Sequence, residues 1–372
     1  PGLPPFQGGW AGLLGYEVAH QFERLPRVLA DEFELTPVVL GYYDTVIAFD
    51  HQLNRAWIIS HAPTDRRTND AASRLEYFFT LVTEEASPSP RPRRGKSTAV
   101  TLAPAMTQPV RAGLYSNFSE DQYRQAVADV VEYIRAGDVF QVNLSQRLLT
   151  RCNEDPVDLY LRTSAATPAP FSAYFDAEHF QVLSVSPERF LSVRQRQVEA
   201  RPIKGTRRLT GQEQEDARLG RELEHDPKER AENTMIVDLL RNDLSRACEP
   251  ASVRVPQRCG LERYGYVQHL VSVVQGQLRP EATPIELLSQ AFPGGSVTGA
   301  PKVRAMEIIS ERERVVRGPY CGALGYFGTG QGDCDTSILI RTATLSRGWL
   351  QIPVGGGIVA DSDPQAEYEE TW

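Results

Sequence analysis

Hydrophobic and polar residues recur along the chain with two periods, and each period predicts one kind of element. The clearest helical pattern lies between Ser119 and Gly137. Ser119 and Gln122, three residues apart, form a capping box that is typical of a helix start, and Gly137 is typical of a helix end. The apolar stripe predicted to be buried consists of Tyr123, Val127, Val130 and Ile134.

The same two periods predict the remaining elements. Strands are predicted over 38–49, 56–60, 139–149, 172–175, 180–186, 189–194, 197–201, 252–255, 267–278, 321–328, 335–345 and 349–354. Further helices are predicted over 70–83, 156–163, 213–224, 227–240, 284–291 and 301–312. The strands are long and the chain does not alternate β-α-β from its start, which favours an α+β fold over a doubly wound sheet.

One segment interrupts these patterns and divides the chain into three parts. Residues 86–113 are rich in Pro and Arg and show no apolar period, so we expect a solvated linker. Its basic cluster could also be a binding patch. The linker separates an N-terminal part, 1–85, from a larger region, 114–372. The chain does not begin with Met and ends at Trp372 inside a helical pattern, so we expect the natural protein to continue beyond both ends.

Composition excludes several classes of partner. The chain has 372 residues, of which 41% are hydrophobic and 24% charged, as in ordinary globular proteins. A net charge of −8 disfavours nonspecific binding of nucleic acid. Apolar runs fall short of the roughly 18 residues that a membrane-spanning helix needs. The five cysteines show no C-x-x-C spacing, so we expect reduced thiols and a cytoplasmic location.

Lys204 is unusual because most basic residues of this chain are arginine. Among the 40 basic residues, the lysines are Lys96, Lys204, Lys228 and Lys302. Arginine keeps its proton in proteins, whereas a desolvated lysine can lose its proton and act as a nucleophile or base. Lys204 is predicted to lie on a short turn between Pro202 and Gly205. A catalytic lysine and a solvated turn lysine are both compatible with this placement.

Two predicted helices begin in the same way, with an Asp N-cap, a Pro and two glutamates three residues apart. The first is Asp226-Pro227 with Glu229 and Glu232, and the second is Asp363-Pro364 with Glu367 and Glu370. Each pair of glutamates shares one helix face. If the two faces meet, the four carboxylates would repel one another unless a hard cation such as Mg²⁺ lies between them. The alternative is that these side chains cap their helices or are solvated.

Two glycine-rich segments are suited to binding an anion through backbone N–H groups. Gly355, Gly356 and Gly357 follow a predicted strand, and residues 292–302 form a loop rich in glycine and hydroxyl groups that opens a helix. A tight turn is the alternative for the first segment. Arg341, expected within a strand, could bind a carboxylate bidentately or pair with an internal acid. His269 lies in a predicted strand, where a buried structural histidine is the default interpretation.

Together these stretches resemble the chorismate-utilising enzymes related to anthranilate synthase component I. The resemblance extends over residues 6–372 and is densest from Phe118 onward. The motifs that carry it are 138–147, Ser186-Pro-Glu-Arg-Phe190, Pro202-Ile-Lys-Gly-Thr206, 232–243, Gly299-Ala-Pro-Lys302 and Asp361-Ser-Asp-Pro364 with its glutamates. The resemblance implies two large, mostly antiparallel sheets packed as a sandwich with helices outside.

Two positions indicate a branch of this family. Anthranilate synthases carry alanine where Lys204 stands, whereas aminodeoxychorismate synthases component I carry Pro-Ile-Lys-Gly-Thr, as here. Similar isochorismate and salicylate synthases place a water-activating lysine where this chain has Gln141. The chain therefore resembles the branch that aminates chorismate to 4-amino-4-deoxychorismate, a precursor of 4-aminobenzoate for folate.

The resemblance also implies roles for individual residues. Lys204 would be the nucleophile and Glu188 the acid, and the glutamates at 229, 232, 367 and 370 would hold Mg²⁺. The groups implied to bind or line the substrate are Thr206, His269, Ser296, Thr298, Tyr320, Arg341, Gly355, Gly356 and Gly357. A glutamine amidotransferase, on another polypeptide or on a segment beyond this sequence, would supply ammonia, and a tryptophan could bind beside the loop 168–173.

Two alternatives remain open at this stage. The chain could be an anthranilate synthase component I, which Lys204 opposes. It could also be a noncatalytic relative that binds chorismate or tryptophan, which the retained lysine and glutamates oppose.

Overall fold

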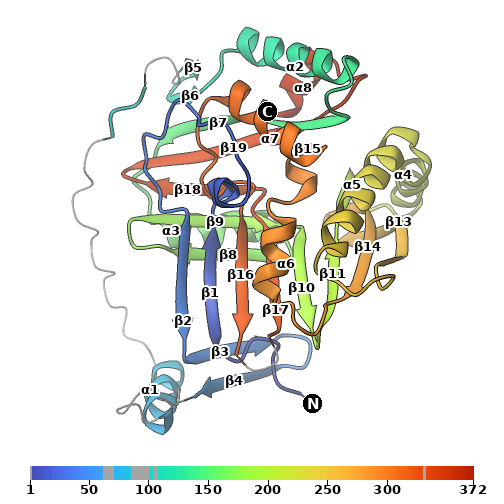
Figure 1. The fold of residues 1–372 in the computed structure, drawn as a ribbon. Helices are drawn as coiled ribbons and strands as arrows, with labels where there is room; N and C mark the ends of the chain where they lie inside the picture. The colour runs from blue at the N-terminus through green and yellow to red at the C-terminus, as the bar shows by residue number, and fades with distance from the viewer. Residues whose placement is uncertain (1, 62–70, 85–99, 104–107, 330–331) are drawn as a thin grey trace.

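The computed structural model describes residues 2–61, 71–84, 100–103, 108–329 and 332–372. Two large sheets form its centre, and their strands run in different directions in Figure 1. The strand pairings within both sheets are antiparallel. Together with the helices, this architecture confirms the predicted α+β class with large antiparallel sheets.

The first sheet contains nine strands among the described residues. In spatial order they are β12 (Ile203–Arg208), β14 (Val267–Gln277), β11 (Gln197–Arg201), β10 (Arg189–Arg194), β17 (Cys334–Ile338), β16 (Ala323–Gly328), β1 (Gly9–Leu14) and β2 (Val38–Tyr43), with β13 (Arg254–Tyr264) paired to β14. The hydrophobic stretches of this sheet come from both ends of the chain, so its register depends on long-range pairing.

The second sheet contains eight strands in the described parts of the chain. Their order is β5 (Gln108–Arg111), β6 (Leu114–Ser116), β7 (Gln141–Arg151), β19 (Trp349–Ile358), β18 (Thr342–Ser346), β9 (Phe180–Ser186) and β8 (Phe171–Asp176), with β15 (Gly299–Ala300) paired to β7. Leu13 of the first sheet packs with Phe180 and Val182 of the second in one buried cluster. The two sheets therefore pack against each other.

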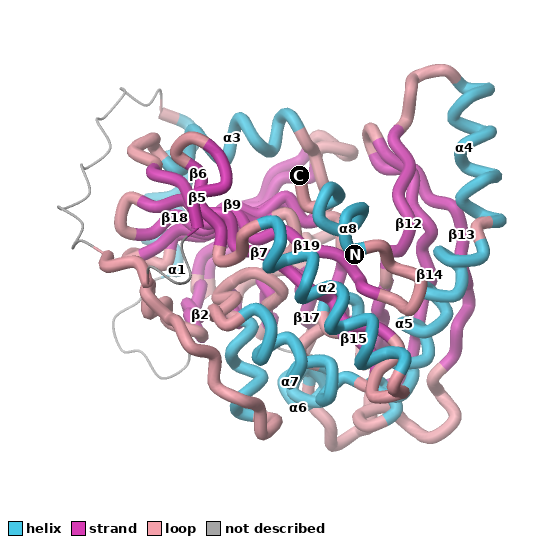
Figure 2. Tube along the Cα trace, turned by 90° about the horizontal axis from the view of Figure 1, so that it is seen from above, coloured by secondary structure: helices cyan, strands magenta, loops and turns pink. Residues whose placement is uncertain are grey.

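The helices cover these sheets. They are α1 (Ala71–Thr83), α2 (Glu120–Arg135), α3 (Pro156–Ala166), α4 (Glu213–His225), α5 (Pro227–Ser245), α6 (Pro284–Ala291), α7 (Lys302–Glu313) and α8 (Pro364–Glu370), with short 3-10 turns η1 (Tyr16–Gln21) and η3 (Gly295–Val297). In Figures 1 and 2, α4 and α5 lie along β13 and β14, while α2 lies beside α8. The capping box of Ser119 and Gln122 is present at the start of α2, as predicted.

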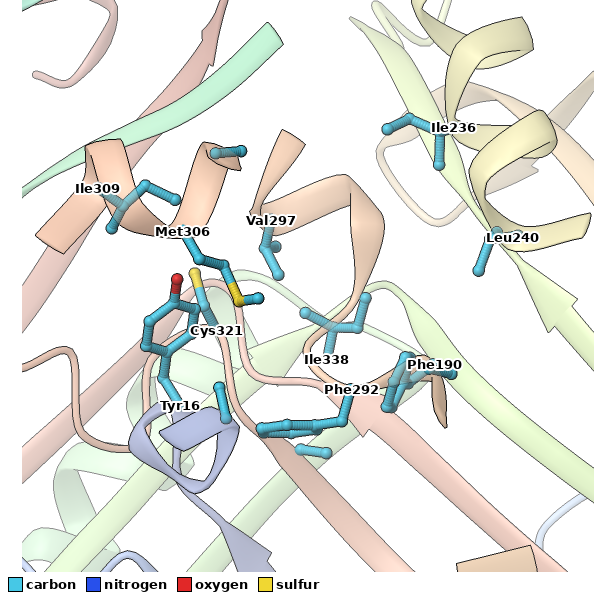
Figure 3. Close-up of a cluster of buried hydrophobic side chains, with 14 of the residues drawn as sticks. Tyr16, Phe190, Ile236, Leu240, Phe292, Val297, Met306, Ile309, Cys321 and Ile338 are labelled. Carbon is cyan, nitrogen blue, oxygen red and sulfur yellow. The ribbon is translucent and has the colours of Figure 1, made fainter. Parts of the chain in front are cut away.

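The main hydrophobic core joins helices and both sheets. Figure 3 shows Tyr16, Met306 and Cys321 pointing toward one another, although they come from η1, α7 and the segment before β16. Phe190 and Phe292 pack edge to face in the same core, with ring centroids 6.2 Å apart. This core packs against the elements that carry the predicted functional residues.

Several predicted elements differ from the observed ones. The predicted strand 38–49 is two strands, β2 and β3 (Thr45–Asp50), and β3 pairs only with β4 (Arg55–Ser60) in a separate hairpin among the described residues. The prediction over 335–345 joined β17 and β18, which belong to different sheets. Apolar runs show neither where a chain changes sheet nor which strands pair.

The predicted linker lies mostly outside the described residues, namely at 86–99 and 104–107. Within its described part, β5 pairs with β6 and extends the second sheet. The N-terminal part contributes β1 and β2 to the first sheet, and α1 packs against β4 beside the hairpin. Among the described residues, no helix combines the length and apolarity needed to cross a membrane.

Candidate active site

One cavity of about 750 Å³ brings together most of the predicted functional residues. It opens where the chain passes from one sheet to the other. Pro187 and Glu188 connect β9 to β10, and Ile340 and Arg341 connect β17 to β18, so both connections leave one sheet and enter the other. The predicted residues that line this cavity are Glu188, Lys204, Thr206, Glu229, Glu232, His269, Ser296, Tyr320, Arg341, Gly355, Gly356, Gly357, Glu367 and Glu370.

Lys204 lies on strand β12 and not on the turn that the sequence predicted. Lys204 pairs with Leu270 and Thr206 with His269, so Gly205 is an extra residue that forms a bulge. Gly205 has φ +65°, and a Cβ there would lie 2.6 Å from Leu223. The bulge therefore requires glycine. The Lys204 ammonium is mostly buried and lies 3.6 Å from the Glu232 carboxylate.

Glu188 is the buried acid of the cavity, with 3% of the residue exposed. Burial raises the pKa of Glu188 to about 7, against the opposing effects of the Ser296 hydroxyl and the Lys204 charge. A carboxyl group with this pKa carries its proton for much of the time near neutral pH. Glu188 can therefore donate a proton within the cavity.

Thr206 and His269 form a hydrogen-bonded pair across the β12–β14 ladder, with Oγ1 and Nδ1 2.9 Å apart. The Gly205 carbonyl oxygen lies 3.3 Å from the same ring nitrogen. Burial lowers the pKa of His269, and the charge of Arg341 lowers it further, so the imidazole is held neutral. Its other nitrogen, Nε2, is buried and has no hydrogen-bond partner among the described residues. His269 therefore retains one polar atom for a bound molecule.

The two helix starts that carry glutamates form as predicted. Asp226 caps α5 by accepting from the N–H groups of Lys228 and Glu229, and Asp363 caps α8 by accepting from Ala366. A proline follows each cap at the first helical position. The caps fix where each helix begins, and thereby direct the glutamates of both helices toward one cavity.

These glutamates are electrostatically unfavourable to one another. Burial raises the pKa of Glu229, and the neighbouring Glu232 raises it further. Burial likewise raises the pKa of Glu367, with Glu370 and Glu232 adding to the effect. Hard carboxylate oxygens crowded in this way fit a divalent cation such as Mg²⁺. The described part of the chain holds no group of three or more acidic, His or Cys side chains already gathered as a metal site.

The three glycines lie inside strand β19 and do not follow it. Gly355, Gly356 and Gly357 pair with Ser145, Leu144 and Asn143 of β7. The sequence analysis placed these glycines after the strand, with N–H groups that converge on an anion or with a tight turn. The structure shows neither a turn nor convergence of all three N–H groups, because an extended strand points successive N–H groups to opposite sides. The other edge of β19 pairs with β18 only over residues 349–351. Along the glycines this edge faces the cavity, where N–H groups directed away from β7 can bind an anion.

Arg341 and Tyr320 form another part of the lining. Arg341 was expected inside a strand, but it lies between β17 and β18 with φ +50°. Its guanidinium lies 3.4 Å from the Tyr266 hydroxyl, and it forms no ion pair with any described acid within 4.0 Å. The guanidinium therefore remains available for an anionic ligand. Tyr320 is buried, with 5% of the residue exposed.

The two hydroxyl residues of the 292–302 loop differ in their placement. Ser296 lines the cavity, whereas Thr298 does not. Thr298 is fully buried and its hydroxyl donates to the Gly294 carbonyl oxygen at 3.0 Å. The structure thus assigns Thr298 to the support of the loop. Thr298 was predicted to bind substrate, but in this position it does not line the cavity.

Asn143 is a cavity residue that the sequence did not single out. It lies on β7, and its Oδ1 is buried with no hydrogen-bond partner in the described part of the chain. Gln141, two residues earlier, is fully buried, and neither its amide oxygen nor its amide nitrogen has a hydrogen-bond partner within the described ranges. Nine consecutive residues of β7 are buried, so the strand shows no alternation that would reveal which side chains face the cavity.

Comparison with known proteins identifies the family. The family described as chorismate binding enzyme matches residues 2–372. Aminodeoxychorismate synthase component 1 from Escherichia coli (strain K12) is 40% identical over 99% of this chain and 75% of its own length. Anthranilate synthase component 1 from Thermus thermophilus is 39% identical over 100% of this chain and 77% of its own length.

The chain is also similar to a solved structure of this family. Anthranilate synthase component I from Streptococcus pneumoniae superposes with a TM-score of 0.85 at 32% identity, covering 100% of this chain and 80% of that one. Identities of 40% and 39% do not separate the two named activities. They do confirm the predicted resemblance, and the chain belongs to the chorismate binding enzyme family as a chorismate-utilising enzyme of the anthranilate and aminodeoxychorismate synthase group.

Proposed function

We propose that the chain converts chorismate and ammonia to 4-amino-4-deoxychorismate. The observation that carries this proposal is the position of Lys204, whose ammonium projects into the same cavity as Glu188 and the four glutamates. Anthranilate synthases, by the resemblance described above, lack this lysine. A buried amine beside a protonated acid supplies a nucleophile and a proton donor for replacing a hydroxyl group.

The proposed reaction has two substitutions. The neutral amine of Lys204 forms a bond to C2 of chorismate, both ring double bonds shift by one position, and the C4 hydroxyl leaves as water with the proton from Glu188. Ammonia then forms a bond to C4, both double bonds shift back, and Lys204 is released from C2 as the amine. The proton that the nitrogen of ammonia loses restores Glu188. Chorismate and ammonia are consumed, and aminodeoxychorismate and water are formed, so no oxidant or reductant is needed.

The glutamates supply the proposed cation site. Glu232 and Glu370, supported by Glu229 and Glu367, would hold Mg²⁺. When bound, the cation would neutralise the ring carboxylate of chorismate and offset the charge of Glu232, which now lies 3.6 Å from the Lys204 ammonium.

The remaining lining residues would bind and orient the dianionic substrate. Arg341, free of any carboxylate partner among the described residues, would bind the enolpyruvyl carboxylate together with Tyr320. Backbone N–H groups of Gly355–357 would bind the ring carboxylate. Thr206 and the neutral His269 would contact the ring of chorismate.

The proposed ammonia donor is a glutamine amidotransferase on another polypeptide. The relatives are named as component 1 of their synthases, which implies a second component. Loss of pyruvate from the product would then fall to a separate lyase.

Product analysis tests the proposal directly. Protein, chorismate, Mg²⁺ and excess ammonium salt are incubated at mildly alkaline pH and separated by liquid chromatography with mass detection. We expect a product in which an amine replaces the hydroxyl group and the enolpyruvyl group is intact. Fluorescent anthranilate with released pyruvate would place the chain with the second candidate, anthranilate synthase, which the 39% identity to the Thermus thermophilus enzyme favours.

A further inference from the structure

A buried ion pair lies beside β7, outside the cavity. Arg317 Nη2 is 2.6 Å from Glu313 Oε1, and Arg317 Nε is 2.8 Å from Glu313 Oε2. Each side chain is only 2% exposed. Neither residue lines the cavity, so neither can touch a substrate there.

The guanidinium of Arg317 holds two walls of the cavity. Its Nη1 donates to the Val297 carbonyl oxygen at 2.9 Å, and its Nη2 donates to the Asn143 carbonyl oxygen at 2.8 Å. Val297 and Asn143 both line the cavity but come from η3 and β7. One rigid planar group therefore fixes the distance between these two elements.

Glu313 binds the same strand, β7, two residues further along. Its Oε1 accepts from the Ser145 N–H at 2.8 Å and from the Ser145 hydroxyl at 2.9 Å. Ser145 is paired with Gly355, and Asn143 with Gly357, in the β7–β19 ladder. The ion pair thus fixes β7 at the two positions that support the glycine segment of the cavity.

Arg317 is itself held from the other side. Its backbone N–H donates to Glu17 at 2.7 Å, and the N–H of Gly318 donates to the same carboxylate at 3.0 Å. The guanidinium carbon lies 4.7 Å from the Tyr16 ring centroid and 5.9 Å from that of Tyr320, a third wall residue. Arg317 therefore links β7, η3 and Tyr320 through contacts that are all buried.

A buried ion pair contributes little net stability compared with apolar residues of similar volume, because desolvation opposes the attraction. Such a pair does impose a defined geometry on the groups it binds. We propose that Arg317 and Glu313 are positioning residues, which set the spacing of β7, η3 and Tyr320 so that the cavity holds its substrate in a reactive orientation. This inference rests on the proposed function, since it assumes that chorismate reacts in this cavity.

The test compares two buried arginines on matched ion pairs. Arg147 lies on the same strand β7, forms bonds of 2.9 and 3.1 Å to Glu32, and does not line the cavity. Arg317→Lys keeps the charge but loses the planar set of donors. We expect kcat of Arg317→Lys to fall at least about tenfold at a temperature where it is fully folded, since small displacements of positioned groups slow reactions strongly. Arg147→Lys should lower Tm comparably and keep kcat within about twofold of wild type.

Equal kcat in the two variants and in wild type would overturn the inference and leave the pair with a stabilising role only. If Arg317→Lys does not fold, Glu313→Gln and its control Glu32→Gln replace the first pair, with the same expected contrast. The wild-type product is identified beforehand, and each kcat is taken relative to wild type for that product. A wild-type enzyme that forms anthranilate would therefore contradict the proposed function and leave the contrast between variants measurable.

Discussion

The polar residues that line the cavity and those that bind β7 from outside the cavity are of the same kinds but in opposite states. On the cavity side, His269 and Asn143 retain unpartnered polar atoms, and the pKa values of Glu188, Glu229 and Glu367 are raised by burial. Outside the cavity, the Arg317–Glu313 pair is satisfied by other protein groups. Polar groups left unsatisfied next to a cavity destabilise the protein and are available to a ligand, whereas satisfied ones fix the frame.

Two buried lysines allow the strongest contrast between these states. Lys302 donates to Asp243 and to the Ala291 carbonyl oxygen, both at 2.6 Å, and lies outside the cavity. We expect Lys204→Ala to lower amination at least about a thousandfold with little change in Tm, because the nucleophile is lost. Lys302→Ala should instead cost about 3 kcal/mol or more of stability by leaving Asp243 unpaired, with kcat per folded molecule retained. Steady-state kinetics and urea unfolding of both variants measure this contrast.

Glu188 and Glu17 sharpen the comparison through pH, since burial raises the pKa of both to about 7. We expect Glu188→Gln to lower kcat by about a hundredfold, because glutamine cannot donate the proton. The wild-type carboxyl keeps its proton in the folded state and releases it in the unfolded state between pH 4.5 and 7. Stability from this group is therefore present below about pH 4.5 and lost as pH rises through about 7.

Urea unfolding of wild type and Glu188→Gln at acidic and alkaline pH measures that loss. From acidic to alkaline pH, the free energy of unfolding of Glu188→Gln should rise relative to that of wild type by on the order of 3 kcal/mol. Glu17 is unchanged in both proteins, so its own titration cancels from the difference. A difference in stability that does not vary with pH would show that Glu188 titrates normally.

Adjacent glutamates on α8 test the proposed cation site. Glu370 lines the cavity, whereas the exposed Glu369 does not and accepts a hydrogen bond from Gln365. Glu370→Gln should raise the Kd for Mg²⁺ at least about tenfold, since one carboxylate ligand is removed. Glu369→Gln should leave the Kd unchanged. Calorimetric titration with Mg²⁺ alone gives both values, and equal values in the two variants would remove α8 from the site.

The smallest effects are expected at the glycines of β19. A Cβ on Gly355 would lie 2.3 Å from the Leu144 carbonyl oxygen, so Gly355→Ala should cost about 1–3 kcal/mol. A Cβ on Gly356 has its nearest neighbour, Glu367 Oε2, at 3.4 Å, so Gly356→Ala should change stability by less than about 0.5 kcal/mol. Thermal unfolding of the two variants measures the difference, and a similar Tm for both would contradict the register given for β19.

The local parts of this site could be predicted from the sequence. Asp226 and Asp363 cap helices through contacts within three residues, and the capping box at Ser119 is equally local. The glutamate pairs follow from helical spacing alone. Lys204 was predicted as a candidate because the chain otherwise uses arginine.

What the sequence could not show depends on contacts between distant segments. Arg341 lies where the chain leaves one sheet for the other, and Gly355–357 belong to a strand because β7, about 210 residues earlier, pairs with them. Asn143 escaped prediction because β7 is buried on both faces. The pair of Arg317 and Glu313 acts through backbone groups of other elements, which no local pattern reveals.

The most direct test of the central claim is detection of the covalent intermediate on Lys204. The protein is mixed with chorismate and Mg²⁺ without ammonium, quenched, and examined by intact mass and peptide mapping. We expect an added mass of chorismate less one water on the peptide that contains Lys204, and none in Lys204→Ala. Absence of this adduct, together with ammonium-dependent product from Lys204→Ala at the wild-type rate, would falsify the role of Lys204 as the nucleophile.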